Sequence, residues 1–268
     1  MAASRSSSPN SWFTLLEGRA AFELGAMWAA SPMLRAFGRG DRHPVLVLPG
    51  FTGDDRSTGP LRALLRAQGY WAHGWRLGQN LGPTTKIVSG LTARLEELHE
   101  RHGMPVSLVG WSLGGIYART LARQNPEMVR QVITLGSPFR MMNGDRSKAS
   151  GMYDSLGHLH DKDALVFDVP ESERAPLQMP ATAIYTRTDG VVRWFHCIDE
   201  AGPMSENVEV IGSHSGLGFN PAVSWVVLDR LSQPVGSWRP FYPGPLIRHL
   251  YPLPANWQEA RAAAAANA

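Results

Sequence analysis

The chain is predicted to form one α/β domain whose mostly parallel central sheet carries helices on both faces. Short apolar runs such as Pro44–Leu48 are typical of strands that are buried on both sides. Stretches with helical spacing of apolar residues alternate with these runs, which is the order expected of a parallel sheet. With 268 residues and 43% hydrophobic content, the chain can bury a single large core.

The N-terminal residues precede this sheet and differ from it in composition. Residues 1–10 are rich in Ser and are predicted to be disordered. Between Trp12 and Phe37 the spacing predicts a helix, or a pair broken at Ser31-Pro32, docked on the body. Its apolar residues at helical spacing are Phe13, Leu16, Ala20, Leu24 and Met27. Because this apolar face is wide, contact with a membrane surface is the alternative to packing on the protein.

Charged residues interrupt the N-terminal apolar segment. They are Glu17, Arg19 and Glu23. A secretory h-region or a membrane span would not carry so many charges in so short a stretch. We therefore expect neither a signal peptide nor a transmembrane helix here.

The core elements follow in alternation. After Pro44–Leu48, strands are predicted at Tyr70–Trp75, from Val106 to the glycine at 110, at Val129–Leu135, at Thr182–Thr186 and at Val208–Ile211. Helices are predicted from Pro60 to the C-cap Gly69, from Thr84 to Gly103, from Ile116 through Ala122, and from Pro221 with Asn220 as N-cap. Parallel strands joined this way place their carboxyl ends, and the site, along one edge.

Two regions lack this periodicity. Residues 139–179 lie between two predicted strands and read as a lid or cap inserted in the core. Residues 234–268 form a tail rich in Pro and aromatics, expected to wrap over the surface and to fray in the alanines after Trp257. The expected organisation is therefore an N-terminal segment at 1–42, a core at 43–233 with that insertion, and the tail.

The stretch Gly110-Trp111-Ser112-Leu113-Gly114 joins a predicted strand directly to a predicted helix. A sharp strand-to-helix corner has strained dihedrals and leaves no room for side chains two residues either side of its tip. Glycines at both positions satisfy that demand. The pattern predicts a corner that exposes the Ser112 hydroxyl.

Polar residues follow two later strands in the same way. Asp189 comes after the strand at Thr182–Thr186, and His214 comes after the strand at Val208–Ile211. Asp168 and Asp199 are the rival acids, although neither follows a core strand as directly.

With this order of Ser, Asp and His, residues 43 to 231 resemble the α/β-hydrolase superfamily, and within it bacterial lipases and esterases. The resemblance implies that Ser112 is the nucleophile and His214 its base, with Asp189 orienting the imidazole. It also implies an oxyanion hole made by the backbone N–H of Leu113 and a donor after the first core strand. Phe51 is the candidate for that donor and Thr52 the alternative, because Pro49-Gly50 stands where many relatives have His-Gly.

The function that follows is hydrolysis of carboxylic esters, of the lipase or esterase type, through an acyl-enzyme and without a cofactor. Acyltransferases, thioesterases and polyester depolymerases use the same three residues, and a non-catalytic binding protein of this fold is the alternative from another class. The motif His158-Leu159-His160-Asp161-Lys162-Asp163 reads as solvated surface, so no metal is expected.

The expected partner is a small-molecule or lipid ester. The net charge of +3 comes from scattered basic residues without a dense block, so nucleic acid binding is not expected. The single cysteine, Cys197, fits a reducing compartment, and we expect a cytoplasmic protein, with membrane association if the N-terminal helix binds lipid.

Overall fold

The computed structural model describes residues 8–35, 40–142, 144–161, 169–200 and 202–254. Six strands form one sheet in the order β2-β1-β3-β4-β5-β6, and every neighbouring pair is parallel. The strands are β1 Pro44–Leu48, β2 Trp71–Gly74, β3 Val106–Trp111, β4 Val129–Leu135, β5 Ala181–Tyr185 and β6 Ser205–Glu209. The helices are α1 Ser11–Leu16, α2 Ala20–Arg35, α3 Gly59–Ala67, α4 Thr85–His102, α5 Leu113–Gln124, α6 Ser150–Ser155 and α7 Pro221–Ser232. The predicted α/β class is confirmed.

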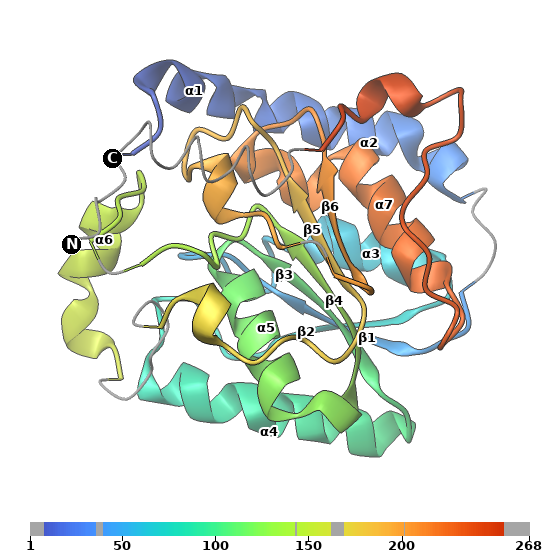
Figure 1. The fold of residues 1–268 in the computed structure, drawn as a ribbon, viewed down its shortest axis with the longest axis horizontal. Coiled ribbons are helices and arrows are strands. Elements are labelled where there is room, and N and C mark those ends of the chain that lie inside the picture. Colours follow the sequence, from blue (N-terminus) through green and yellow to red (C-terminus); the bar gives the residue numbers. More distant parts are fainter. Residues whose placement is uncertain (1–7, 36–39, 143, 162–168, 201, 255–268) are drawn as a thin grey trace.

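Two apolar layers hold the helices on the sheet, because successive strand residues point to opposite faces. Val45 and Val47 of β1 pack with side chains of α2, α3 and α7. Leu46 and Leu48 of the same strand pack with side chains of α4 and α5. Figure 1 shows this sandwich, with α4 and α5 on one side of the sheet and α3 and α7 on the other.

Local capping accounts for where several helices begin and end. The Thr84 hydroxyl accepts from the Ile87 N–H at the start of α4, which ends at Gly103 in the left-handed conformation. The Asn220 side chain accepts from the N–H of Ala222 at the start of α7, and proline occupies the first turn. These caps stand where the sequence places them.

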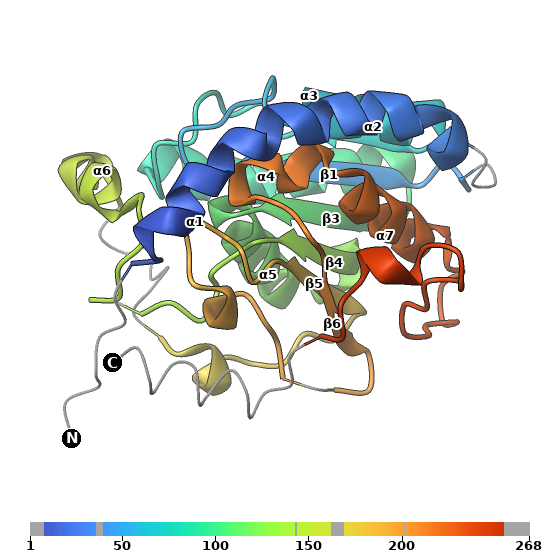
Figure 2. The same cartoon turned by 90° about the horizontal axis from the view of Figure 1, so that it is seen from above.

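The N-terminal segment departs from the prediction. A break was expected at Ser31-Pro32, but α2 runs through Pro32 and the break is a 3-10 turn at Glu17–Arg19. The exposed Pro32 lies within the last turn of α2 and has no N–H to bond to the preceding turn. In the 3-10 turn the side chains of Glu17 and Arg19 bond to loops of the core. Figure 2 shows α1 and α2 along the α3 and α7 side of the sheet.

The edge strand β6 also begins earlier than predicted. Strand pairing runs from Ser205 to Glu209, whereas the apolar run had suggested 208–211. The strand lies at the sheet edge, where polar residues such as Glu206 pair as well as apolar ones. The residues 1–7 and 255–268, where disorder and fraying were expected, fall outside the described part of the chain.

The insertion at 139–179 carries α6 and two short 3-10 turns in its described residues. Both views show α6 standing away from the sheet. No helix in the described ranges is long and apolar enough to cross a bilayer.

Candidate active site

Ser112 lies at the corner between β3 and α5. Its backbone has φ 53° and ψ −122°, a combination that residues with side chains rarely adopt and that stores strain. A Cβ on Gly110 would lie 2.4 Å from the Gly114 carbonyl oxygen, and one on Gly114 would lie 2.5 Å from the Leu48 oxygen. Only glycine fits at both positions. The corner therefore holds the Ser112 hydroxyl at the carboxyl end of the sheet, where it is partly exposed.

The three predicted polar residues meet at this corner. His214 Nε2 lies 3.0 Å from Ser112 Oγ, and His214 Nδ1 lies 2.6 Å from Asp189 Oδ2. His214 and Asp189 are buried, so their contact is shielded from water. Residues that are 102 and 25 positions apart in the chain thus form one continuous hydrogen-bonded chain.

Neighbouring backbone keeps the acid and the base in place. The second oxygen of Asp189 accepts from the N–H groups of Val191 and Val192, each at 2.8 Å. Trp111 Nε1 donates to the His214 carbonyl at 3.1 Å. Gly136 has φ +54°, and a Cβ there would lie 3.2 Å from His214 Nδ1. The imidazole is therefore confined on several sides.

The electrostatic surroundings of His214 favour its charged form. Burial opposes the imidazolium, but the charge and hydrogen bond of Asp189, with the charge of Glu17, outweigh it and raise the pKa of His214 above its ordinary 6.5. A base with a raised pKa takes a proton more readily when a hydroxyl nucleophile attacks.

The candidate oxyanion donors lie beside Ser112. Leu113 is the first residue of α5, so its N–H is one of those that a helix leaves without an internal acceptor. The N–H of Thr52, the alternative donor, is already bonded to the Asn80 carbonyl at 2.7 Å. Among the described residues no acceptor is seen for the Phe51 N–H. The geometry thus favours Phe51 over Thr52.

A small cavity opens next to the hydroxyl. It measures about 60 Å³, and its walls come from the loop after β1, the α5 start, the insertion and the loop after β5. They are lined by Phe51, Ser112, Leu113, Ile116, Pro138, Met141, Ser147, Ala149, Ser150, Tyr153, Val191 and Val192. The Phe51 and Tyr153 rings meet edge to face at 5.5 Å, which links the candidate oxyanion loop to α6.

Comparison with solved structures identifies the fold. No protein-family model and no curated protein sequence matches the chain. A structure of the metagenome-derived lipolytic enzymes LipS and LipT is 21% identical with a TM-score of 0.52, the match covering 72% of this chain and 93% of that one. The α/β hydrolase MGS-MChE2, from a sediment metagenome of the lagoon of Mar Chica, Morocco, is 17% identical with a TM-score of 0.50 over 72% and 91%. The chain has the α/β-hydrolase fold.

The pyrethroid hydrolase PytH aligns to the same extent, at 16% identity and a TM-score of 0.51 over 72% of this chain and 99% of its own. Each of these three matches leaves 28% of this chain uncovered.

Sequence reasoning missed three residues of the N-terminal segment that contact the loops of the site. They are Glu17, Arg19 and Glu23, which bond to the acid loop, the base loop or both. Their sequence signal was that they are the only charged residues between positions 11 and 34. In an otherwise apolar segment such charges need partners when the segment docks.

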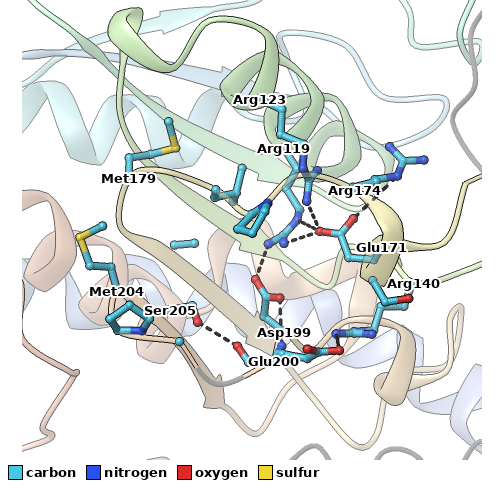
Figure 3. A pocket seen from close by; sticks show the side chains of 16 residues that line it. Arg119, Arg123, Arg140, Glu171, Arg174, Met179, Asp199, Glu200, Met204 and Ser205 are labelled. Atoms are coloured by element: carbon cyan, nitrogen blue, oxygen red, sulfur yellow. Dashed lines mark hydrogen bonds and ion pairs between the residues drawn. The ribbon is translucent and has the colours of Figure 1, made fainter.

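The rival acids do not reach His214. Asp199 pairs with Arg119 at 2.7 Å in the wall of a separate cavity of about 280 Å³, shown in Figure 3. Glu171 of the insertion meets Arg119 and Arg123 of α5 in the same wall. This network ties the insertion to the helix that follows Ser112. Asp168 lies outside the described residues.

The histidine-rich motif of the insertion is only partly described. His160 Nε2 lies 3.0 Å from the Leu81 carbonyl oxygen, while Lys162 and Asp163 fall outside the described residues. Within the described ranges no three His, Cys, Asp or Glu side chains gather as metal ligands would.

A second Ser-His-Asp chain occurs at the opposite end of the sheet. His43 Nε2 lies 2.8 Å from Ser107 Oγ, and His43 Nδ1 lies 2.5 Å from Asp41 Oδ1. Ser107 belongs to β3, five residues before Ser112, and is completely buried. No motif in the sequence indicated this contact.

Proposed function

We propose that the protein is a serine hydrolase that cleaves carboxylic esters through an acyl-enzyme. The observation that carries this proposal is the unbroken hydrogen-bonded chain from the strained, partly exposed Ser112 through His214 to Asp189. Lipolytic enzymes and a pyrethroid hydrolase among proteins of similar fold support the reaction class.

In the acylation step, Ser112 Oγ attacks the acyl carbon while His214 Nε2 takes the hydroxyl proton. The carbonyl oxygen becomes an oxyanion and accepts from the N–H groups of Phe51 and Leu113. Asp189 stabilises the imidazolium that forms. The imidazolium then returns the proton to the leaving alcohol as the ester C–O bond breaks.

In the deacylation step, His214 takes a proton from water as the water oxygen attacks the acyl-enzyme. The oxyanion forms again beside the same donors, and its collapse releases the carboxylic acid. The proton returns to Ser112 Oγ. The reaction needs no cofactor, because every proton moves between these side chains, the substrate and water.

The cavity suggests the acyl group. Its small volume and apolar walls, including Ile116, Met141 and Val192, suit a short aliphatic acyl chain better than a fatty acyl chain. We expect kcat/KM to fall as the acyl chain of a 4-nitrophenyl ester lengthens. Met141→Ala, which enlarges the cavity, should move the preference toward longer chains. If the chain-length preference of Met141→Ala were the same as that of the wild type, the acyl group would have to bind outside this cavity.

The alternative reactions differ from ester hydrolysis in substrate or in acceptor. A thioesterase or a polyester depolymerase would hydrolyse another acyl substrate, whereas an acyltransferase would pass the acyl group to an alcohol instead of water. Assays with thioesters, polyester films and alcohol acceptors separate them. A binding protein without catalysis is the alternative from another class.

A fluorophosphonate probe tests the proposal directly. We expect labelling of the wild-type protein at Ser112, read as a mass increase on the tryptic peptide that contains it, and none in Ser112→Ala. An ester panel of graded acyl length, run on both proteins, gives the reaction. A folded wild-type protein that is neither labelled nor active would favour the binding-only alternative.

We also propose that the outer face of α1 and α2 contacts an anionic lipid surface. Phe22 and Trp28 are 81% and 66% exposed, while the two carboxylates of residues 11–34, the partly buried Glu17 and the buried Glu23, bond to the core. The basic Arg248 is exposed next to Leu250, which shares an apolar cavity with Phe22. Apolar side chains beside positive charge are what an anionic bilayer surface binds.

Vesicle flotation tests this contact. We expect the wild-type protein to float with anionic phospholipid vesicles and the double variant Phe22→Ser, Trp28→Ser to float several-fold less. Point variants replace deletion of the segment, because Glu17 and Glu23 contact the site loops. A dimer in light scattering that the double variant dissociates would instead make this face a subunit interface.

A further inference from the structure

The carboxylate of Glu17 joins the two loops that carry the acid and the base. Its Oε1 accepts from the Gly190 N–H at 2.9 Å and from the His214 N–H at 3.0 Å, and its Oε2 accepts from the Ser215 N–H at 2.8 Å. Gly190 follows Asp189 directly. One side chain from the N-terminal segment therefore holds the main chain at both members of the proposed acid-base pair.

The surrounding segment is shaped for this contact. A Cβ on Gly190 would lie 2.3 Å from the Phe13 carbonyl oxygen, and one on Gly216 would lie 1.9 Å from Glu23 Oε2. At Gly190 the contact is with backbone, so only glycine allows this approach, whereas a Cβ at Gly216 would displace the Glu23 carboxylate. Gly190 and Gly216 thus make room for the N-terminal segment, a role that the Ser-His-Asp triad alone does not require.

We propose that Glu17 is a positioning residue of the Ser112 site: it fixes the backbone of the acid and base loops and places a second negative charge at the His214 main chain. The proposal rests on the proposed function for its catalytic meaning. The effect of Glu17 on His214 itself does not depend on the substrate.

The charge of Glu17 is present at neutral pH. Burial alone would raise the pKa of the Glu17 carboxyl, but hydrogen bonds from Ser215, Gly190 and His214 outweigh it and lower the pKa. A carboxylate close to an imidazole stabilises the imidazolium. Glu17 therefore acts in the same direction as Asp189.

Other charged or titratable groups also face this region. They are Asp189 and Cys197 from the loop after β5, Arg19 from the 3-10 turn, and Glu23 from α2. Arg19 donates to the Gly212 carbonyl and Thr188 hydroxyl, and Glu23 accepts from the Ser213 N–H. The charges of Asp189 and Glu17 raise the pKa of His214, so Glu23 offers a matched carboxylate for comparison.

The variant Glu17→Gln keeps the size of the side chain and removes its charge. We expect the pKa of His214, followed by its ring proton resonances in NMR and assigned with His214→Gln, to fall. In turnover, the acidic limb of kcat/KM should move to lower pH by the same amount, and kcat should fall about 10-fold as the loops lose one anchor. Glu17→Asp restores the charge on a shorter side chain. The acidic limb of kcat/KM should therefore return close to its wild-type pH, while kcat should recover less.

Glu23→Gln is the control. Its carboxylate also accepts a backbone N–H of the base loop, so it should lower the melting temperature without moving the pH limb. An unchanged His214 pKa in folded Glu17→Gln, or equal shifts in both variants, would overturn the proposal. Because the NMR titration needs no substrate, a wild-type protein without esterase activity would contradict the proposed function while leaving this result readable.

Discussion

In the described residues, two hydrogen-bonded Ser-His-Asp chains have their serine on or directly after β3, an outer one at Ser112 and an inner one at Ser107, and only the outer serine is partly exposed. At the carboxyl end of β3, His214 lies 3.0 Å from Ser112, and toward the amino end His43 lies 2.8 Å from Ser107. Judged by hydrogen-bond distance alone, the second chain is the better formed. The two therefore show that a hydrogen-bonded triad is not sufficient to define a site.

The backbone and the surroundings make the difference. Ser107 lies in regular strand with no exposed surface, so no acyl group can reach it. Ser112 has a strained φ of 53°, a partly exposed side chain, and the first N–H of a helix beside it. A nucleophile needs an entry path and oxyanion donors as well as a base.

The two histidines also differ in charge preference. Burial and the nearby Arg130 lower the pKa of His43, although Asp41 opposes them. Asp189 and Glu17 raise that of His214 against burial. The lowered pKa favours a neutral His43 imidazole beside the ionised Asp41, whereas the raised pKa of His214 favours its protonation when a hydroxyl gives up a proton.

The largest expected difference between the two chains is in kcat, when the Asp of each chain is replaced by Asn. Asp189→Asn should lower kcat about 10⁴-fold, because the amide favours the wrong imidazole tautomer. Asp41→Asn should leave kcat unchanged, since Asp41 touches no part of the proposed site. Steady-state kinetics on one ester measures both, and a comparable loss in the two variants would contradict the assignment.

The strained corner can be broken without touching the triad. Gly114→Ala brings a Cβ to 2.5 Å from the Leu48 carbonyl oxygen, so we expect a loss of about 3 kcal/mol in unfolding free energy and a fall in kcat. Urea unfolding measures the first effect. Gly151→Ala is the control, because a Cβ at that exposed position of α6 has no atom within 4 Å and Ala suits a helix better. Equal stabilities would refute the steric account.

The inner chain should matter for stability alone. Ser107→Ala removes the hydroxyl that contacts His43 and accepts from Gln131, and it leaves buried polar groups unpaired. We expect a loss of about 1–3 kcal/mol in unfolding free energy with kcat intact. If kcat fell with it, the inner chain would have to influence the outer one through β3.

The smallest contrast is the pH dependence. His214 must be neutral to act as base, so kcat/KM should rise with pH through a pKa above 6.5. Its raised pKa stabilises the folded protein at lower pH, and that contribution is lost as pH rises through the same pKa. The lowered pKa of His43 acts oppositely, so its contribution is present above 6.5 and lost as pH falls.

Measuring kcat/KM and the free energy of unfolding over the same pH range separates the contribution of His214 from that of His43. His43→Gln should reduce the loss of stability between neutral and mildly acidic pH and leave the rate profile in place. A displaced rate profile in that variant would mean that His43 also influences the reaction.

The sequence by itself determined the sheet, the corner and the order of the site residues. Apolar runs bounded by glycine and proline fix strands such as Pro44–Leu48 and Val129–Leu135 locally, and both stand as predicted. The corner at Ser112 follows from glycines on either side, which no other residue could replace. Such features depend on neighbours in the chain, which a sequence displays directly.

Only the tertiary structure decided which polar groups meet across the chain. The pairing of Thr52 with Asn80, of Asp199 with Arg119, and of Glu17 with the loops of Gly190 and His214 joins residues far apart in sequence. The Glu17 contacts lie at the 3-10 turn Glu17–Arg19 that separates α1 from α2. Glu17, Arg19 and Glu23 interrupt an apolar segment in the sequence, but in the structure they bond to the core. Charged groups that are buried need such partners, and the core supplies them.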